Sequence, residues 1–306
     1  MPYTIEAQGL TKAFGSTRVL EGLDLQIEAG EVFALLGPNG AGKTTTVRIL
    51  STLLAPDTGA ARVAGHDVVK DRIAVRRAIS LTAQEAAVDG VLTGAENLRM
   101  MARLRKVPNG TMRTRELLER FDLSDAADRR VATYSGGMRR RLDLAMSLVS
   151  RPEVIFLDEP STGLDPRSRL AVWEAVQALA SDGATILLTT QYLDEADRLA
   201  DRIAVVDHGR IAALGTAHEL KARVGEETLE LFFADGETLE AARQILDGHV
   251  TDESLRVPAA GAEDVHRALD TLATNGLHAQ RLEVHRPTLD EVFLALTDST
   301  STGARA

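Results

Sequence analysis

The amino-acid sequence predicts an α/β protein with a parallel sheet, followed by a small α+β domain. Three apolar runs are typical of strands covered on both faces: 32–36, 154–157 and 184–189. Helical patterns separate these runs, and strands that alternate with helices form parallel sheets through crossover connections. From about Ala222 the long runs give way to short alternating segments. This change of pattern predicts two domains, 1–221 and 222–306.

Local patterns predict the elements of the first 60 residues. Residues 4–10 form the first predicted strand, and apolar residues alternate over 23–27 as in a half-buried second strand. The run at 32–36 leads into a Gly-rich segment and then into a helix over about 43–53. Turns are expected where Gly, Ser, Pro and Asp gather: 15–16, 29–30 and 56–59.

The later elements are predicted in the same way. Residues 93–150 are rich in Leu, Ala, Arg and Glu, which predicts a mostly helical subdomain. In the C-terminal domain, alternation at 228–233 and 280–284 predicts strands. Four apolar residues near the end recur at a spacing of three or four, as on one face of a helix: Leu289, Val292, Phe293 and Leu296. The tail 298–306 is expected to be frayed.

Composition and charge exclude several kinds of protein. There is no cysteine, which excludes disulfides, thiolate metal sites and thiol nucleophiles. The longest stretches without a charged residue span 11 residues, short of the ~18 that a membrane-spanning helix needs, so no direct membrane span is expected. Residues 222–306 hold 16 acidic and 7 basic side chains, and with them most of the net charge of −10. That surplus argues against nucleic acid or anionic lipid as the partner of this segment.

The first candidate site is a phosphate-binding loop, because residues 37–44 fit the pattern G-x-x-x-x-G-K-[ST]. The pattern follows a predicted strand and opens a predicted helix, which is the context that it requires. Lys43 supplies a point charge for phosphate oxygens, and the Thr44 hydroxyl can ligate Mg²⁺. The candidate nucleotide-binding residues are those of the loop and the start of its helix: Gly37, Pro38, Asn39, Gly40, Ala41, Gly42, Lys43, Thr44 and Thr45.

Two carboxylates, Asp158 and Glu159, follow the apolar run at 154–157. A buried strand that ends in Asp places one carboxylate near the Mg²⁺ of a bound phosphate, usually through a water. The adjacent Glu159 points elsewhere and can orient or deprotonate an attacking water. The alternative is a strand that ends in two solvated acids, and the presence of the phosphate loop weakens it.

A second anion site is predicted at 134–138, where the sequence reads Tyr-Ser-Gly-Gly-Met before a helical segment. With two such sites the sequence resembles the ATP-binding cassette (ABC) ATPases, whose signature motif matches four residues: Ser135, Gly136, Gly137 and Met138. In that family the signature of one subunit closes over the γ-phosphate held by the phosphate loop of the other. The resemblance therefore implies ATP binding and an ATP-driven homodimer.

The resemblance covers about residues 1–220. It implies the P-loop NTPase fold of an ABC cassette, with a RecA-like parallel-sheet core and with antiparallel β and helical subdomains. Phe14 stands where the family stacks an aromatic residue on adenine, with a packed core Phe as the alternative. Gln84 falls at the Q-loop, which senses Mg²⁺ and touches the membrane partner. The D-loop, which lies along the dimer interface, matches Ser161, Gly163, Leu164 and Asp165.

One position departs from the family pattern. The switch residue after the strand at 184–189 is normally a His, and Gln191 stands there. Gln can donate a hydrogen bond to a γ-phosphate oxygen but cannot be protonated. The expected catalytic residues are therefore Glu159, Gln191 and Lys43, and the expected metal ligands are Thr44, Gln84 and Asp158. His208 is expected to be a turn residue and not a substitute for the switch.

The ending at 287–296, together with Gln191, looks like the daunorubicin-resistance type of drug-export ATPases. That resemblance implies the ATP-hydrolysing subunit of an exporter of an amphipathic drug or lipid-like compound, with ATP and Mg²⁺ as cofactors. It also implies integral membrane permease subunits as partners and a peripheral place at the cytoplasmic face of the membrane. Two alternatives stay open: an importer ATPase, and a soluble ABC ATPase acting on ribosomes or DNA.

Overall fold

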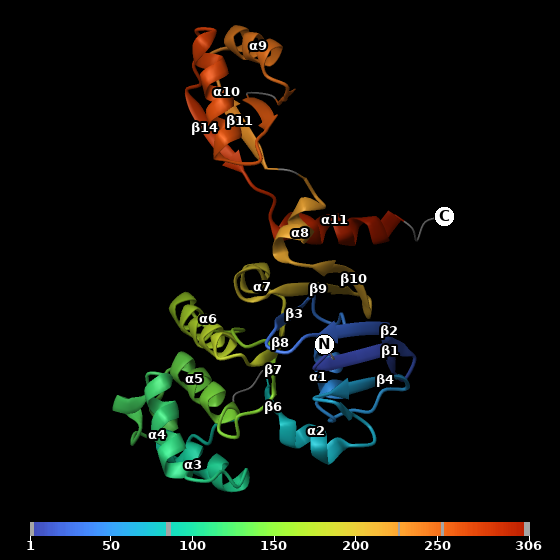
Figure 1. The fold of residues 1–306 in the computed structure, drawn as a ribbon, viewed down its shortest axis with the longest axis vertical. Helices are drawn as coiled ribbons and strands as arrows, with labels where there is room; N and C mark the ends of the chain where they lie inside the picture. Colours follow the sequence, from blue (N-terminus) through green and yellow to red (C-terminus); the bar gives the residue numbers. More distant parts are fainter. Residues whose placement is uncertain (1–2, 84–86, 226, 252–253, 303–306) are drawn as a thin grey trace. The chain divides into compact units, whose positions relative to one another are not determined.

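A computed structural model describes residues 3–83, 87–225, 227–251 and 254–302 of the chain. The chain divides into two compact units: unit 1, Met1–Ala217, and unit 2, His218–Ala306. The first unit has two sheets and the second has one (Figure 1). Each unit also has its own apolar core, and each is described by itself.

The centre of unit 1 is a six-stranded sheet in the order β10-β9-β3-β8-β7-β6. Five strands are parallel, and β10 runs antiparallel to β9. Three strands are buried along their whole length: β3 (Val32–Leu36), β7 (Val154–Asp158) and β8 (Thr185–Thr190). The other three are β6 (Ile79–Thr82), β9 (Arg202–Asp207) and β10 (Arg210–Gly215). The parallel sheet predicted from the apolar runs is confirmed.

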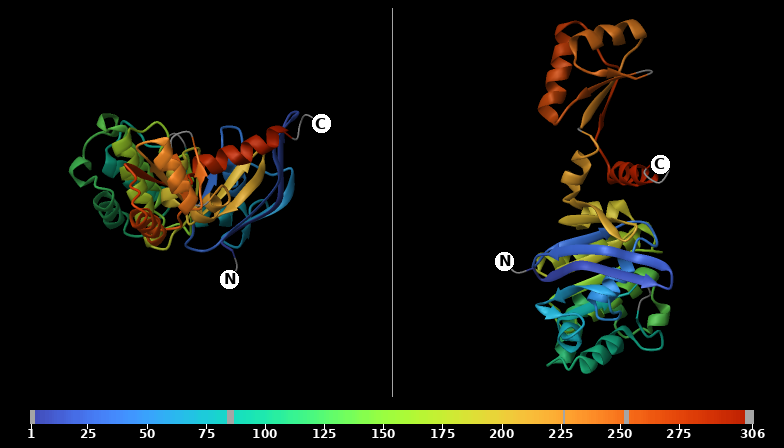
Figure 2. Two further views of the ribbon diagram at one scale, coloured as in Figure 1. Left: turned by 90° about the horizontal axis from the view of Figure 1, so that it is seen from above. Right: turned by 90° about the vertical axis from the view of Figure 1, so that its right-hand side faces the viewer.

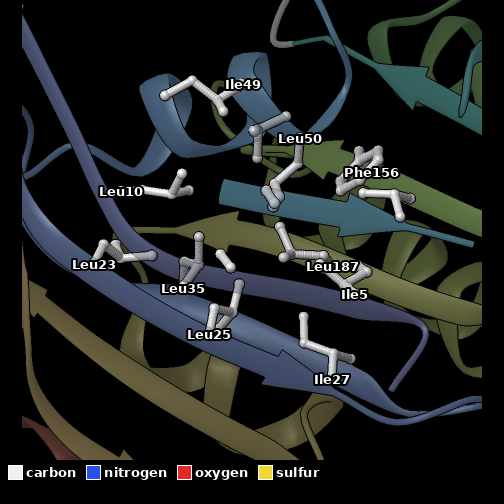
Figure 3. Packing of buried hydrophobic residues seen from close by; sticks show 14 of the residues in the cluster. Ile5, Leu10, Leu23, Leu25, Ile27, Leu35, Ile49, Leu50, Phe156 and Leu187 are labelled. Carbon is white, nitrogen blue, oxygen red and sulfur yellow. The ribbon is translucent and has the colours of Figure 1, made fainter. Parts of the chain in front are cut away.

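A second sheet of unit 1 is antiparallel, in the order β2-β1-β4-β5. Its strands are β1 (Ile5–Phe14), β2 (Thr17–Ile27), β4 (Thr58–Val63) and β5 (His66–Asp67). One apolar core joins the two sheets and α1 (Lys43–Leu50), as Figure 3 shows. In it, Leu35 and Phe156 of the parallel sheet lie in one cluster with Ile5 of β1 and with Ile49 and Leu50 of α1.

Helices cover the rest of unit 1. On the side of the parallel sheet away from α1 lie α6 (Pro166–Ser181) and α7 (Leu193–Leu199), as Figure 1 shows. The predicted helical region contains α3 (Gly94–Leu104), α4 (Gly110–Arg120) and α5 (Gly136–Ser147). Helix α3 begins with a capping box, in which Thr93 and Glu96 satisfy each other's backbone N–H groups. A shorter helix, α2 (Arg72–Ala78), precedes β6.

Unit 2 is an α+β unit with an antiparallel sheet in the order β12-β13-β11-β14. Its strands are β11 (Thr228–Phe232), β12 (His249–Val250), β13 (Ser254–Pro258) and β14 (Arg281–His285). Helices α9 (Gly236–Ile245) and α10 (Ala262–Thr274) cover one face (Figure 2), where Leu229, Leu255 and Leu272 share a core. The unit also contains most of α8 (Ala217–Ala222) and all of α11 (Leu289–Thr302).

Three expectations from the sequence differ from the structure. The helix expected over 43–53 ends at Leu50. The turn expected at 56–59 is wrong in its second half, because Thr58 and Gly59 begin β4. A Cβ on Gly59 would lie 2.4 Å from the Gly9 carbonyl oxygen, so this glycine serves close pairing of β4 with β1. Fraying is also wrong for residues 298–302, since the backbone of α11 is helical to Thr302, and residues 303–306 lie outside the described residues.

Of the four residues predicted to form the apolar face of α11, Leu289 and Val292 are buried and Phe293 is half-buried, and the side chain of Leu296 lies outside the described residues. No helix within the described ranges combines the length and the apolar character that crossing a bilayer requires.

Candidate active site

The candidate site lies where three neighbouring strands of the parallel sheet end. In the sheet, β8 lies between β3 and β7, and the register places Leu36 beside Thr190 and Asp158 beside Thr189. The carboxyl ends of parallel strands meet at one edge, so the phosphate loop after β3 and the two acids at the end of β7 come together there. The Gly37 N–H donates to the Thr190 carbonyl at 3.3 Å and ties the loop to β8.

Glycine is required at both ends of the phosphate loop. A Cβ on Gly37 would lie 2.3 Å from the Val206 carbonyl oxygen of β9. Gly42 has φ +106, and its Cβ would lie 2.6 Å from Cδ2 of Leu20 in β2. The loop is therefore packed against β2 and β9 so closely that only glycine fits, and α1 begins directly after it at Lys43. The first N–H groups of α1 have no partner within the helix and can therefore bind an anion.

Lys43 is buried and folds back over the loop. Its ammonium Nζ donates to the carbonyls of Gly37 at 2.7 Å and Pro38 at 3.0 Å, and lies 3.8 Å from Oε1 of Glu159. Burial lowers the pKa of Lys43, and the carboxylates of Glu159 and Asp158 act in the opposite direction. The structure thus places a desolvated cation beside the two acids, at the position where a phosphate would meet it.

Asp158 is held by two hydroxyl groups. Thr189 Oγ1 donates to its Oδ1 at 2.6 Å, and Thr44 Oγ1 donates to the same atom at 3.1 Å. A hydroxyl and a carboxylate are oxygen ligands of the kind that Mg²⁺ binds. Within the described residues no group of three or more His, Cys, Asp or Glu side chains could hold a metal by itself. This donor set therefore fits an ion that is also held by phosphate oxygens.

Glu159 is buried beside Lys43 with an uncommon backbone. Its φ is +47, and its N–H donates to both the carbonyl and Oγ1 of Thr189, at 3.1 and 3.0 Å. Thr162 Oγ1 donates to its Oε2 at 3.2 Å. A left-handed backbone at a residue other than glycine is tolerated where surrounding contacts fix it, commonly at functional sites. The two carboxylates thus accept from different hydroxyl groups: Thr44 and Thr189 donate to Asp158, and Thr162 donates to Glu159.

The signature residues form the first turn of α5. Ser135 is the N-cap and accepts a hydrogen bond from the Met138 N–H at 3.2 Å. A Cβ on Gly137 would lie 2.5 Å from Ser168 Oγ of α6, so glycine allows α5 to approach α6. Within the described part of the chain, no hydrogen bond or ion pair joins this motif to Lys43 or Thr44.

The predicted D-loop connects β7 to α6. Ser161 is completely buried, and the Cβ of Gly136 would be 3.6 Å from Cδ2 of Leu164. Asp165 is the N-cap of α6 and accepts from the N–H and the hydroxyl of Ser168, at 3.0 and 2.6 Å. The loop therefore lies beside the start of the signature helix of its own chain.

The remaining predicted site residues lie farther out. Phe14 is 51% exposed at the end of β1, with Nζ of Lys12 5.8 Å from its ring centroid, so the alternative of a packed core Phe is wrong. Gln191 is half-buried directly after β8. His208 lies in the turn between β9 and β10 with φ +44. Gln84 lies outside the described residues.

Sequence reasoning missed residues that support the site. Thr189 donates to the Asp158 carboxylate and accepts from the Glu159 N–H, although in the sequence it reads only as the end of an apolar run. Arg140 and Asp143 are both buried in α5. The sequence shows three consecutive arginines, Arg139, Arg140 and Arg141, but it does not show which of their side chains is buried.

Comparison with known proteins decides the family. Residues 20–162 match the model of the ABC transporter family, and residues 215–297 match that of the "ATP-binding protein DrrA1-3-like, C-terminal domain". The chain is 51% identical to the daunorubicin/doxorubicin resistance ATP-binding protein DrrA of Streptomyces peucetius, over 96% of this chain and 92% of that protein. The chain belongs to the ABC transporter ATP-binding proteins. It is an ATPase of this family and binds ATP.

Other similar proteins agree with this family. The ABC ATPase is 38% identical to Nod factor export ATP-binding protein I of Ralstonia nicotianae, over 96% of this chain and 93% of that protein. A solved structure of an ATP binding subunit of an ABC transporter matches with a TM-score of 0.65 at 29% identity, covering 72% of this chain and 92% of that one. The structure of cbiO1 from Clostridium perfringens, part of an ABC transporter complex, matches with a TM-score of 0.68 at 26% identity and the same coverage. The ABC ATPase fold predicted from the sequence is confirmed.

Proposed function

We propose that this ABC ATPase drives the export of an amphipathic drug or lipid-like compound through separate membrane permease subunits. Relatives matched over nearly their whole length are named for drug resistance and for export. An importer ATPase would share the cassette motifs, and the match of residues 215–297 to a DrrA-type C-terminal domain favours export. The proposal places the protein at the cytoplasmic face of the cell membrane, held there by its permease.

The observation that carries the catalytic part of the proposal is the arrangement of Lys43, Asp158 and Glu159 at one sheet edge. In phosphoryl transfer the protein mainly positions groups and stabilises charge. Lys43 and the loop N–H groups bind the β- and γ-phosphates, and Glu159 orients the attacking water and accepts its proton. Gln191 donates a neutral hydrogen bond to the γ-phosphate.

Thr44 and Asp158, with Gln84, would hold Mg²⁺. The ion supplies neutralisation of phosphate charge when it is bound. The hydroxyl-to-carboxylate bond between Thr44 and Asp158 keeps both oxygen donors together at the end of β7. Thr189 fixes the Asp158 carboxylate from the neighbouring strand, so its direction is set by the sheet itself.

The composite site requires a second copy of the chain. Ser135, Gly136, Gly137 and Met138 present the N-terminus of α5, which is an anion site by its backbone dipole. In one chain these residues contact α6 and the D-loop. Two copies paired by ATP would let the signature of one cover the γ-phosphate on the other, with residues 161–165 along the interface.

The test of the catalytic proposal is Glu159→Gln, with Glu153→Gln as the matched control. Glu153 is an exposed acid at the opposite end of β7. Glu159→Gln should bind a fluorescent ATP analogue as the parent does and hydrolyse ATP at least ~10²-fold more slowly, because a general base is lost. The control should hydrolyse at the parental rate. Near-parental turnover by Glu159→Gln would remove this residue from the role.

The test of the export proposal uses cells that express the chain together with a candidate permease. Drug accumulation should fall when both are present and should return when Lys43→Ala replaces the parent chain. Accumulation that does not depend on Lys43 would argue against export driven by this ATPase.

A further inference from the structure

Helix α5 contains a buried ion pair that the proposed hydrolysis does not use. Arg140 and Asp143, one turn apart, are each only 5% exposed. Arg140 Nη1 lies 3.3 Å from Oδ2 of Asp143. Arg140 and Asp143 lie four and seven residues after Gly136, the first residue of α5, which belongs to the signature motif.

Arg140 bonds the main chain of two other segments. Its Nε donates to the Pro160 carbonyl at 2.7 Å, and its Nη1 donates to the Ala83 carbonyl at 2.7 Å. Pro160 directly follows Glu159, and Ala83 directly follows β6. One guanidinium therefore joins the signature helix to the segment that carries the proposed catalytic carboxylate.

Asp143 completes this connection. It accepts a hydrogen bond from the Ala87 N–H at 3.3 Å. Arg140 bonds Ala83 and Asp143 bonds Ala87, so α5 is attached to the segment after β6 at two residues four positions apart. Burial lowers the pKa of Arg140, and the carboxylates of Asp143, Glu195 and Asp158 act in the opposite direction.

The buried pair of Arg140 and Asp143 is not explained by a gain in folding stability. A buried ion pair loses the hydration of two charges, and apolar residues of similar size often stabilise a fold as well or better. Nη2 of Arg140 is also buried, without an acceptor among the described residues. The two strong bonds of Arg140 go to carbonyls, so what the residue provides is a fixed geometry of the main chain around Glu159.

We propose that Arg140, oriented by Asp143, is a positioning residue for ATP hydrolysis that fixes the Glu159–Pro160 main chain relative to the signature helix. The inference rests on the proposed role of Glu159. Without the bond to Pro160, Glu159 loses a support one residue away, while the phosphate loop keeps its own contacts. Turnover should therefore fall and nucleotide affinity should not.

The first experiment is Arg140→Lys in the full-length protein, with Arg141→Lys as the matched control. Lysine keeps the charge but has a single nitrogen, so it cannot reproduce the separate Nε and Nη1 positions that bond Pro160 and Ala83. Arg141 is on the same helix and bonds Phe121 and Asp122 instead. We expect kcat to fall ~10- to 100-fold in Arg140→Lys, the effect of a small misplacement of a catalytic group. The Kd for ATP should change less than ~2-fold, and the control should match the parent.

A double variant distinguishes this inference from the role of Glu159. If Arg140 acts through Glu159, Arg140→Lys should add little to the loss already caused by Glu159→Gln. Full additivity of the two losses, or unchanged kcat in Arg140→Lys, would overturn the inference. Near-parental turnover of Glu159→Gln alone would instead count against the proposed function.

Asp143→Asn keeps the test open if Arg140→Lys does not fold. This variant retains the shape of the side chain and an oxygen for the Ala87 N–H while removing the charge that orients Arg140. It should lower kcat and leave the Kd for ATP unchanged, with parental far-UV circular dichroism. Parental kcat in a folded Asp143→Asn would overturn the part assigned to Asp143.

Discussion

Replacement of Asp143 by Asn should flatten the dependence of stability on pH. Burial raises the pKa of Asp143 from 3.8 to about 6, more than Arg140 and the Ala87 N–H lower it. Between these two values the folded chain binds a proton that the unfolded chain releases. Stability from this residue is therefore present at low pH and is lost as the pH rises toward 6. Asp143→Asn has no proton to lose.

The magnitude follows from the two pKa values. In the folded chain the protonated fraction of Asp143 falls from about nine-tenths at pH 5 to about one-tenth at pH 7, while the unfolded chain is ionised at both. The free energy of unfolding should therefore fall by about 1 kcal/mol more in the parent than in Asp143→Asn over this range. Other groups contribute equally to both proteins and cancel in the comparison.

The assay is urea unfolding followed by tryptophan fluorescence. Trp173 is the only tryptophan of the chain and is buried in α6, where its indole N–H donates to Oε1 of Glu195 at 2.9 Å. Its signal reports unit 1 alone, which avoids treating a chain of two units as one transition. Asp125→Asn removes an exposed acid as the control and should follow the parent.

Equal pH dependence in the parent and in Asp143→Asn would refute the reasoning, because burial would then not govern this carboxyl. A parent that gains stability relative to the variant as the pH rises would show that Arg140 outweighs desolvation. The expected difference of about 1 kcal/mol can be resolved by comparing urea midpoints, provided that the parent and the variant have equal m-values.

Three further results are expected from the site. Gln191→His should introduce an ionisation between pH 6 and 7.5 into the turnover profile, and Gln191→Ala should lose most activity; equal rates for Gln191→Ala and the parent would refute the γ-phosphate contact. Ser135→Arg should abolish turnover and keep nucleotide affinity, and mixing it with Lys43→Ala should restore activity if two copies share each site. Phe14→Ala should raise the Kd for ATP ~10-fold, about the value of one aromatic stack, whereas Phe14→Tyr should not; an unchanged Kd in Phe14→Ala would exclude adenine stacking.

The elements that a sequence can predict here are those governed by local chemistry. The phosphate loop occupies consecutive residues, so its glycines, Lys43 and Thr44 were identifiable before the fold was known. The buried strands β3, β7 and β8 stood out as apolar runs because both faces are covered. Once a parallel sheet was expected, the meeting of loop and acids followed from its carboxyl edge.

The features that were missed depend on long-range packing. Thr58 and Gly59 read as a turn because Pro, Asp, Thr and Gly favour turns, and only pairing with β1 makes them a strand. Strand β13 is missing from the sequence-based prediction because its alternation covers only five residues, and the strand forms by pairing with β11. The inward direction of Arg140 depends on which carbonyls the fold brings to it.

The sheet order sets when the nucleotide site can exist during synthesis. Strand β3 pairs with β8 and β9 and with no strand made earlier, and Val32 is opposite Ile186. At ~5–20 residues per second a ribosome needs roughly 8 to 30 s to add the ~150 residues that separate them. During that interval the phosphate loop is exposed without the strand that bonds Gly37, and Asp158, once it is made, is not yet held by Thr189. A nascent chain should therefore gain affinity for ATP abruptly, only once β8 and β9 have left the ribosome.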